Sequence, residues 1–176
     1  LFMETIQPGV LSMDHYPQFK PEPDGRDGRD KYCGNLEAMR KHSLKAGVPF
    51  WNYFNTMPYS SQTDPTESQL RWQINASLAY GAKGVLYFCY FTPGSIGEFA
   101  KGGAIIRRDG RRTRHYDEAK RINATLKSYG PTLMKLSSTR VERVNETAGD
   151  LAGDVLAGMP ILNVERDPVD PYNDYL

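Results

Sequence analysis

Apolar and polar residues alternate in blocks along the chain, and three apolar blocks predict β-strands. The blocks are residues 9–16, 48–55 and 84–91, which read GVLSMDHY, VPFWNYFN and GVLYFCYF. They are short, contain many β-branched or aromatic side chains, and have Pro or Gly near their ends. The third is the most apolar of the three.

A helix is predicted after each strand, because apolar residues recur there at intervals of three or four. The three helices cover residues 35–47, 64–81 and 115–130. The second has the clearest start, a capping box in which Asp64 is the N-cap, Pro65 occupies the first helical position and Glu67 stands three residues after the cap.

The sequence of strand, long loop, helix and short turn occurs three times, which predicts an α/β domain with a parallel sheet and right-handed crossovers. The domain is expected to span residues 1–137, and Asp109-Gly110 in its last long loop is expected to turn a small hairpin. Residues 138–176 have weak periodicity and an acidic, proline-containing end. They are interpreted as an irregular tail or the start of a following domain.

The loops after the strands are unusually long, about fifteen, eight and twenty residues, whereas connections in β/α units are normally short. In parallel α/β folds, ligands bind at the C-terminal ends of the strands, where these loops gather. Asp14, His15, Tyr16, Asn55 and Tyr90 fall at this edge. No glycine-rich phosphate loop follows a strand, which disfavours nucleotide binding.

Three β/α units cannot close a barrel of eight. A three-stranded parallel sheet that is covered on one side would leave apolar surface bare. We therefore expect the chain to be part of something larger or to pair with another copy, and the first arrangement is the simpler.

Composition adds several exclusions. The chain has 176 residues, 39% hydrophobic and 24% charged, as in an ordinary globular protein. Because 22 Lys and Arg oppose 21 Asp and Glu, a net charge of +1 offers no general attraction for nucleic acid or an anionic membrane. No apolar run is long enough for a membrane helix. Cys33 and Cys89 lack the spacing of a zinc site, and no cofactor is expected.

Signals for localisation are weak. The N-terminus lacks the basic, apolar and small-residue order of a signal peptide. Glycosylation sequons occur at Asn75, Asn123 and Asn145, and the first two fall inside predicted helices, where chance explains them better. They favour a secreted or periplasmic origin only slightly.

Four segments carry a family resemblance: VLSMDHYP, VPFWNYFNTMPY, LRWQINASLAYGAKGVLYFCYFTPG and DGRRTRHYDEAKRINATLKSYGPTL. In this order they resemble the last three β/α units of clan A glycoside hydrolases, especially the beta-galactosidase-like branch. The similarity covers about residues 8–137, and SLAYGAKGV is among its most specific pieces. It implies strands six, seven and eight of a (β/α)8 TIM barrel, a tail that leads toward a β-rich domain, and an oligo- or polysaccharide as the ligand.

The resemblance also implies what the chain lacks. Hydrolysis in this clan needs two carboxyl groups, of which the acid/base follows strand four and so lies outside this chain. The nucleophile should be a glutamate at the end of strand seven, but Asn55 stands near that place, and an amide is a poor nucleophile. The fragment alone is therefore expected to be inactive.

Three functions stay open at this point. The first is an active hydrolase whose carboxylates come from the missing half or from a displaced position. The second is a non-catalytic carbohydrate-binding relative, and the third is an unrelated β/α-barrel enzyme such as an aldolase or isomerase. The sequence has no lysine at a strand end and no phosphate loop, and both absences weigh against the third function.

The candidate ligand-binding residues are Asp14, His15, Tyr16, Trp51, Asn55, Tyr90 and Glu98. Because side chains alternate along a strand, Asp14 and Tyr16 share one side and His15 takes the other, which makes the first two the better candidates. Each has a structural alternative, since Asp14 could cap backbone N–H groups and the aromatic residues could pack in the core. The resemblance makes Tyr90 or Phe91 the aromatic floor of a sugar site.

A basic run surrounds the predicted hairpin and consists of Arg107, Arg108, Arg111, Arg112 and Arg114. Its simplest interpretation is a solvated face. Contact with an acidic sugar or a phosphate is the alternative.

Overall fold

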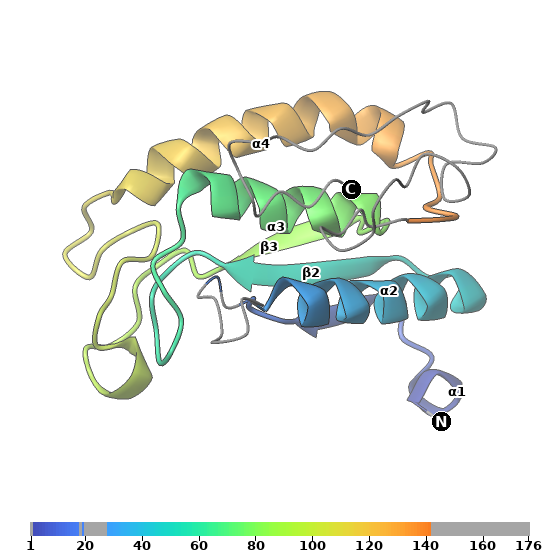
Figure 1. Cartoon of the computed structure of the whole chain (residues 1–176), viewed down its shortest axis with the longest axis horizontal. Coiled ribbons are helices and arrows are strands. Elements are labelled where there is room, and N and C mark those ends of the chain that lie inside the picture. The colour runs from blue at the N-terminus through green and yellow to red at the C-terminus, as the bar shows by residue number, and fades with distance from the viewer. Residues whose placement is uncertain (1, 18, 20–27, 142–176) are drawn as a thin grey trace, which may run out of the picture. The chain divides into compact units, whose positions relative to one another are not determined.

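The structure is a computed structural model that describes residues 2–17, 19 and 28–141, and a three-stranded parallel sheet lies at its centre (Figure 1). The strands are β1 (Leu11–Asp14), β2 (Phe50–Asn55) and β3 (Gly84–Phe88), in the order β1-β2-β3. The helices are α1 (Phe2–Ile6), α2 (Arg29–Ala46), α3 (Glu67–Ala79) and α4 (Arg114–Leu133), and a 3₁₀ helix spans Gly97–Phe99. The mixed α/β class, the three strands and their parallel pairing are confirmed.

Some element ends differ from the prediction. Helix α2 begins at Arg29 rather than at 35, and its extra turn is stabilised by burial of Tyr32 and Cys33. Helix α4 runs through Pro131 to Leu133, although the proline has no N–H to donate to the carbonyl four residues earlier. Strand β3 ends at Phe88, before the predicted residue 91.

The predicted hairpin at Asp109-Gly110 is present as a tight turn. The N–H of Arg107 donates to the carbonyl of Arg111 (2.8 Å), and the N–H of Gly110 donates to the carbonyl of Arg107 (2.9 Å). Ile106 and Arg112 form an isolated antiparallel bridge beside it.

One face of the sheet is covered by helices α2, α3 and α4. Phe54 on β2 is buried in an apolar core with Leu70 and Ile74 of α3 and Ile122 of α4. Helix α4 lies alongside α3, and Tyr87 on β3 packs against the same core (Figure 1). The helices therefore bury the side chains that point to this face.

A buried polar group lies within the covered face. The side-chain amide of Asn52 donates to the hydroxyl of Tyr32 on α2 (2.6 Å) and to the hydroxyl of Ser77 on α3 (2.9 Å). Tyr32 in turn donates to the carbonyl of Gln73 (3.1 Å). Because buried polar atoms need partners, this group fixes the two helices at one position on β2.

The opposite face of the sheet is not covered by any helix among the described residues. Ser12, Trp51 and Gly84 are paired in register there, followed by Asp14, Tyr53 and Leu86. Trp51 is 41% exposed, and its ring lies against the backbone of Gly84, where a Cβ atom would come within 2.6 Å of it. The bare apolar surface that the sequence predicts is therefore present.

The chain divides into two compact units, residues 1–138 and 139–176. The sheet and its helices belong to the first. Residues 142–176, on which the predicted tail or following domain falls, lie outside the described residues, so the nature of that segment stays a prediction.

Candidate functional site

Four aromatic rings meet at the C-terminal edge of the sheet. This rim cluster consists of Tyr16, Tyr59, Phe88 and Phe99, whose neighbouring ring centroids are between 5.3 and 6.1 Å apart. Tyr16 follows β1, Phe88 ends β3, and the other two come from the loops after β2 and β3. Tilted and edge-to-face contacts of this kind are favourable, so the rings hold the three loops together.

The two phenols of the rim cluster are held in their protonated form. Burial raises the pKa of Tyr16, and the negative charge of Asp14 raises it further. Burial also raises the pKa of Tyr59, with smaller contributions from Tyr16, Asp14 and Glu98. Both hydroxyls therefore remain hydrogen-bond donors throughout the neutral range, beside the exposed acceptor oxygens of Asp14.

His15 points to the other side of the strand end, as the alternation predicts. Its Nδ1 accepts a hydrogen bond from the amide of Asn35 on α2 (2.8 Å), and its ring meets the ring of Tyr32 edge-on at 5.5 Å. Burial lowers the pKa of His15, and the charge of Asp14 only partly opposes this. A neutral imidazole with its proton on Nε2 fits these contacts, and it connects the strand end to α2.

Asn55 is 1% exposed, and the loop after β2 uses both polar atoms of its side chain. Its amide donates to the carbonyl of Thr63 (3.3 Å), and its Oδ1 accepts from the N–H of Met57 (3.2 Å). Its backbone N–H donates to Gln73 (2.9 Å). In this arrangement Asn55 organises the loop and does not face open space at the rim.

The remaining candidates lie in different places. Trp51 is near the start of β2, four residues before Asn55 and so about 13 Å along the strand from the rim. Tyr90 is 60% exposed and lines a separate hollow of about 710 Å3 beside β3, together with Tyr53 and Tyr116. Glu98 lies in the 3₁₀ helix next to Phe99, and the N–H of Ser60 donates to its carbonyl (3.0 Å). The structure therefore brings Asp14, Tyr16 and Glu98 to the rim.

No protein-family model matches the chain, and no curated protein matches it at a significant level. None of the helices in the described part of the chain is both long and apolar enough to cross a membrane. Residues 2–17, 19 and 28–141 also contain no cluster of three His, Cys, Asp or Glu side chains suited to a metal ion.

A second group of polar residues lies behind the rim, where the loop after β2 meets the start of α4. Nε2 of His115 is 2.8 Å from Oδ1 of Asp64, and Nδ1 is 2.7 Å from Oε2 of Glu118. Arg114 bonds to the second oxygen of each carboxylate, at 2.8 Å in both cases. Both nitrogens of the buried imidazole therefore face carboxylate oxygens.

This group corrects the predicted role of Asp64. The N-cap of α3 is Thr66, whose hydroxyl accepts from the N–H of Gln69 (3.2 Å), while the side chain of Gln69 accepts from the N–H of Thr66 (3.0 Å). Asp64 is instead bound to α4. Although burial alone would raise the pKa of Asp64, the hydrogen bonds from His115 and Arg114 lower it.

Sequence reasoning missed Tyr59, Phe99, His115 and Glu118. Tyr59 and Phe99 lie in long loops, and an aromatic residue in a loop next to a strand end is the signal that could have identified them. His115 and Glu118 share one side of α4 at a spacing of three residues, but their partner Asp64 is about fifty residues away in the chain. Only the tertiary structure identifies that partner.

Proposed function

We propose that this chain forms strands six to eight of a TIM-barrel carbohydrate-active protein related to clan A glycoside hydrolases, and that its rim contributes to the saccharide-binding site. The rim cluster with Asp14 is the observation that carries the proposal. Aromatic faces pack against the C–H groups of sugar rings, while phenol donors and a carboxylate acceptor bind hydroxyl groups. Both chemistries occur together at the edge where parallel α/β folds bind ligands.

The bare face of the sheet supports the barrel part of the proposal. Within the described residues, β1 and β3 each pair only with β2, so each has an unpaired outer edge. A closed barrel would pair both edges and would bury Trp51, Tyr53 and Leu86 in its interior.

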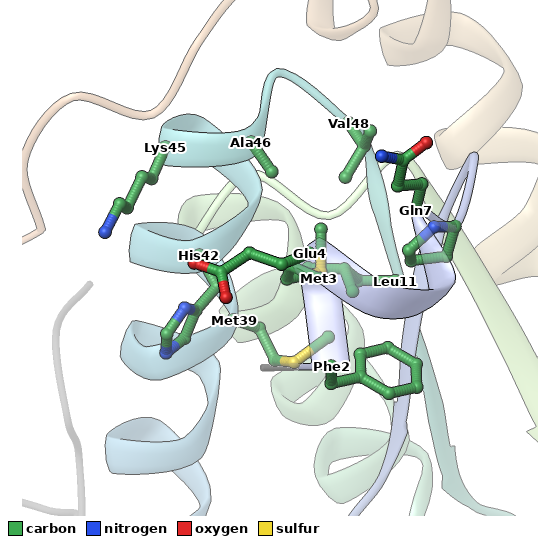
Figure 2. A pocket seen from close by; sticks show the side chains of 11 residues that line it. Phe2, Met3, Glu4, Gln7, Leu11, Met39, His42, Lys45, Ala46 and Val48 are labelled. Carbon is green, nitrogen blue, oxygen red and sulfur yellow. The ribbon is translucent and has the colours of Figure 1, made fainter.

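Hollows beside the two outer strands also support the barrel, because they leave room for its other β/α units. One, of about 670 Å3, lies between α1, the start of β1 and α2, and Figure 2 shows the apolar side chains of Phe2, Leu11, Met39 and Val48 around it. The other, of about 710 Å3, lies between β3 and α4. Neighbouring β/α units of a barrel would pack at these two places.

A non-catalytic, carbohydrate-binding protein is the second candidate, and the surroundings of Asn55 favour it. Hydrolysis by two carboxyl groups needs them close together on either side of the scissile bond. Asn55 stands where the resemblance implies the nucleophile, and its side chain is already bonded within its own loop. Among the described residues, Asp14 and Glu98 bring carboxylates to the rim.

The test uses the complete gene product and a panel of aryl glycosides. Turnover that is lost in Asp14→Asn or Glu98→Gln supports a hydrolase, whereas saturable saccharide binding without turnover supports the binding protein. In both cases Tyr16→Ala is expected to weaken saccharide binding by about tenfold, because it removes one ring and one donor. Asp117→Asn on the exposed side of α4 is the matched control and should change nothing. Neither binding nor turnover by the intact protein would refute the proposal.

A further inference from the structure

A cleft of about 640 Å3 lies behind the rim, between the loop that follows β2 and the loop that joins β3 to α4. Basic side chains outnumber acidic ones in its lining. Five basic side chains face two acidic ones, Asp64 and Asp109, and the basic residues are Lys101, Arg107, Arg108, Arg112 and Arg114. The whole chain carries a net charge of only +1, so this local excess is not a consequence of its general composition.

The charges of two of the five cations are matched by carboxylates. Arg114 forms ion pairs with Asp64 and Glu118, both at 2.8 Å. Arg107 is 3.9 Å from Asp109, which is bonded more closely to Arg111 (2.7 Å).

The other three cations are held by neutral groups among the described residues. The guanidinium of Arg108 donates to three backbone carbonyls, those of Pro93 (2.7 Å), Gly94 (3.2 Å) and Phe99. The ammonium of Lys101 donates to the carbonyl of Ser60 (3.1 Å). Arg112 lies 3.9 Å from the centre of the Tyr116 ring. These contacts hold the side chains in place but leave their positive charge uncompensated.

The backbone of the cleft is shaped around these cations. Gly102 and Gly103 have φ angles of 65° and 101°, which favour glycine, and a Cβ atom on Gly102 would be 3.2 Å from Nη1 of Arg108. The first turn of the twenty-residue helix α4 also lines the cleft, with Thr113 as an N-cap that makes no side-chain capping bond. The positive end of the helix dipole adds to the field of the side chains.

We propose that this cleft binds an oxyanion, a carboxylate, sulfate or phosphate group, through Arg108, Arg112 and Lys101. Such a group supplies the negative charge that the three cations lack. Its oxygens can accept hydrogen bonds from Arg112, from Lys101 and from Nη1 of Arg108, whose Nε and Nη2 already donate to carbonyls. Binding of the anion does not depend on the saccharide function proposed above. The two sources of the group are a free inorganic ion and an acidic saccharide held at the neighbouring rim.

The first test follows backbone amide chemical shifts of the 176-residue protein while sodium sulfate and then sodium phosphate are added at constant ionic strength. Saturable shifts of the amides of residues 101–103 and 112–115 are expected. Arg112→Gln and Lys101→Gln should each weaken binding by about tenfold, since each removes one charge-assisted contact. Neither residue belongs to the apolar core, so both variants should fold.

The matched control is Lys120→Gln, because Lys120 is exposed on α4 and does not line the cleft. It should leave the sulfate affinity unchanged. Shifts that do not saturate, or an equal loss of affinity in all three variants, would overturn the proposal.

A second test separates the two sources. The probes are tri-galacturonate and the neutral trisaccharide that results from reduction of its carboxylates. Tighter binding of the acidic form, lost in Arg112→Gln, identifies a saccharide carboxylate as the ligand group. Equal binding of both sugars together with sulfate binding at the cleft identifies a free ion. Equal binding of both sugars without sulfate binding overturns the anion site and leaves the saccharide function intact.

Discussion

The two faces of the sheet carry side chains of similar size but in different surroundings. On the covered face, Phe54 is fully buried against α3 and α4, and Asn52 donates to hydroxyls on α2 and α3. On the bare face, Trp51 is 41% exposed, and no helix of the described chain packs on it. A small domain that buries only one face of a parallel sheet leaves apolar area in water, which is costly.

The difference shows where the architecture is complete. The covered face has the close packing of a finished core, whereas the bare face has large apolar side chains that are paired in register but lack a partner layer. The two faces meet at the end of β1. There, Tyr16 packs against the loop residue Tyr59, and His15 bonds to Asn35 on α2.

The largest expected effect tests the comparison directly. Phe54→Ala should lower the free energy of unfolding by about 3–5 kcal/mol, because it opens a cavity in the core, whereas Trp51→Ala should lower it by less than about 1 kcal/mol. Urea denaturation monitored by circular dichroism measures both. If the two losses are equal, the bare face is packed in solution. A loss for Trp51→Ala that grows with protein concentration would identify a second copy as its cover.

The next prediction concerns the polar group on the covered face. Asn52→Ala should destabilise the protein by about 1–3 kcal/mol, because it leaves buried hydroxyls on α2 and α3 without their donor. The exposed Asn75 on α3 provides the control, and Asn75→Ala should change the unfolding free energy by less than about 0.5 kcal/mol. Similar values for the two variants would mean that the Asn52 contacts do not contribute to stability.

A third, smaller effect depends on pH. Because the pKa of Asp64 is lower in the folded protein than its ordinary value of 3.8, the carboxylate contributes stability above that pH, and the contribution is lost as the pH falls through the folded pKa. The unfolding free energy of the wild type should therefore fall more steeply below about pH 4 than that of Asp64→Asn. The carboxylate is half exposed, so the difference should be about 1 kcal/mol or less.

Asp117→Asn, on the exposed side of the same helix as His115, is the control for this titration and should keep the steep acid dependence. Parallel curves for the wild type and Asp64→Asn would show that the His115 group does not hold the loop to α4.

The smallest effect is spectroscopic. Burial raises the pKa of Tyr87 to about 12, and its hydroxyl donates to Asn123 (2.8 Å) on the covered face. In an alkaline absorbance titration, Tyr87→Phe should remove an ionisation step near pH 12, while the unfolding free energy falls by about 1 kcal/mol. Tyr129→Phe, which alters an exposed ring on α4, should leave the step near pH 12 in place. Persistence of that step in Tyr87→Phe would contradict the prediction.

Much of the fold could be predicted because its signals are local. The apolar runs around Leu11, Phe50 and Val85 identify strands, and long-loop, short-turn alternation identifies parallel pairing. Alternation along β1 also predicted that His15 and Tyr16 point to different sides. The structure brings Asp14 and Tyr16 to the rim, whereas the side chain of Asn55 at the end of β2 is bonded within its own loop and Trp51 lies near the start of that strand.

The failures concern residues whose surroundings come from distant parts of the chain. Asp64 has the local features of a helix cap, and a local interpretation cannot include His115 and Arg114, which compete for its oxygens. Thr66 then serves as the cap, because its side chain is free to bond to Gln69.

By itself, the sequence determined the strands, their parallel order and the edge at which the loops gather, because hydrophobic periodicity and loop length act over a few neighbouring residues. Only the tertiary structure decided which loop residues meet. The rim cluster, the His115 group and the basic cleft each combine side chains from segments that lie far apart in the sequence. Such contacts form when packing brings distant segments together, and no spacing along the chain encodes them.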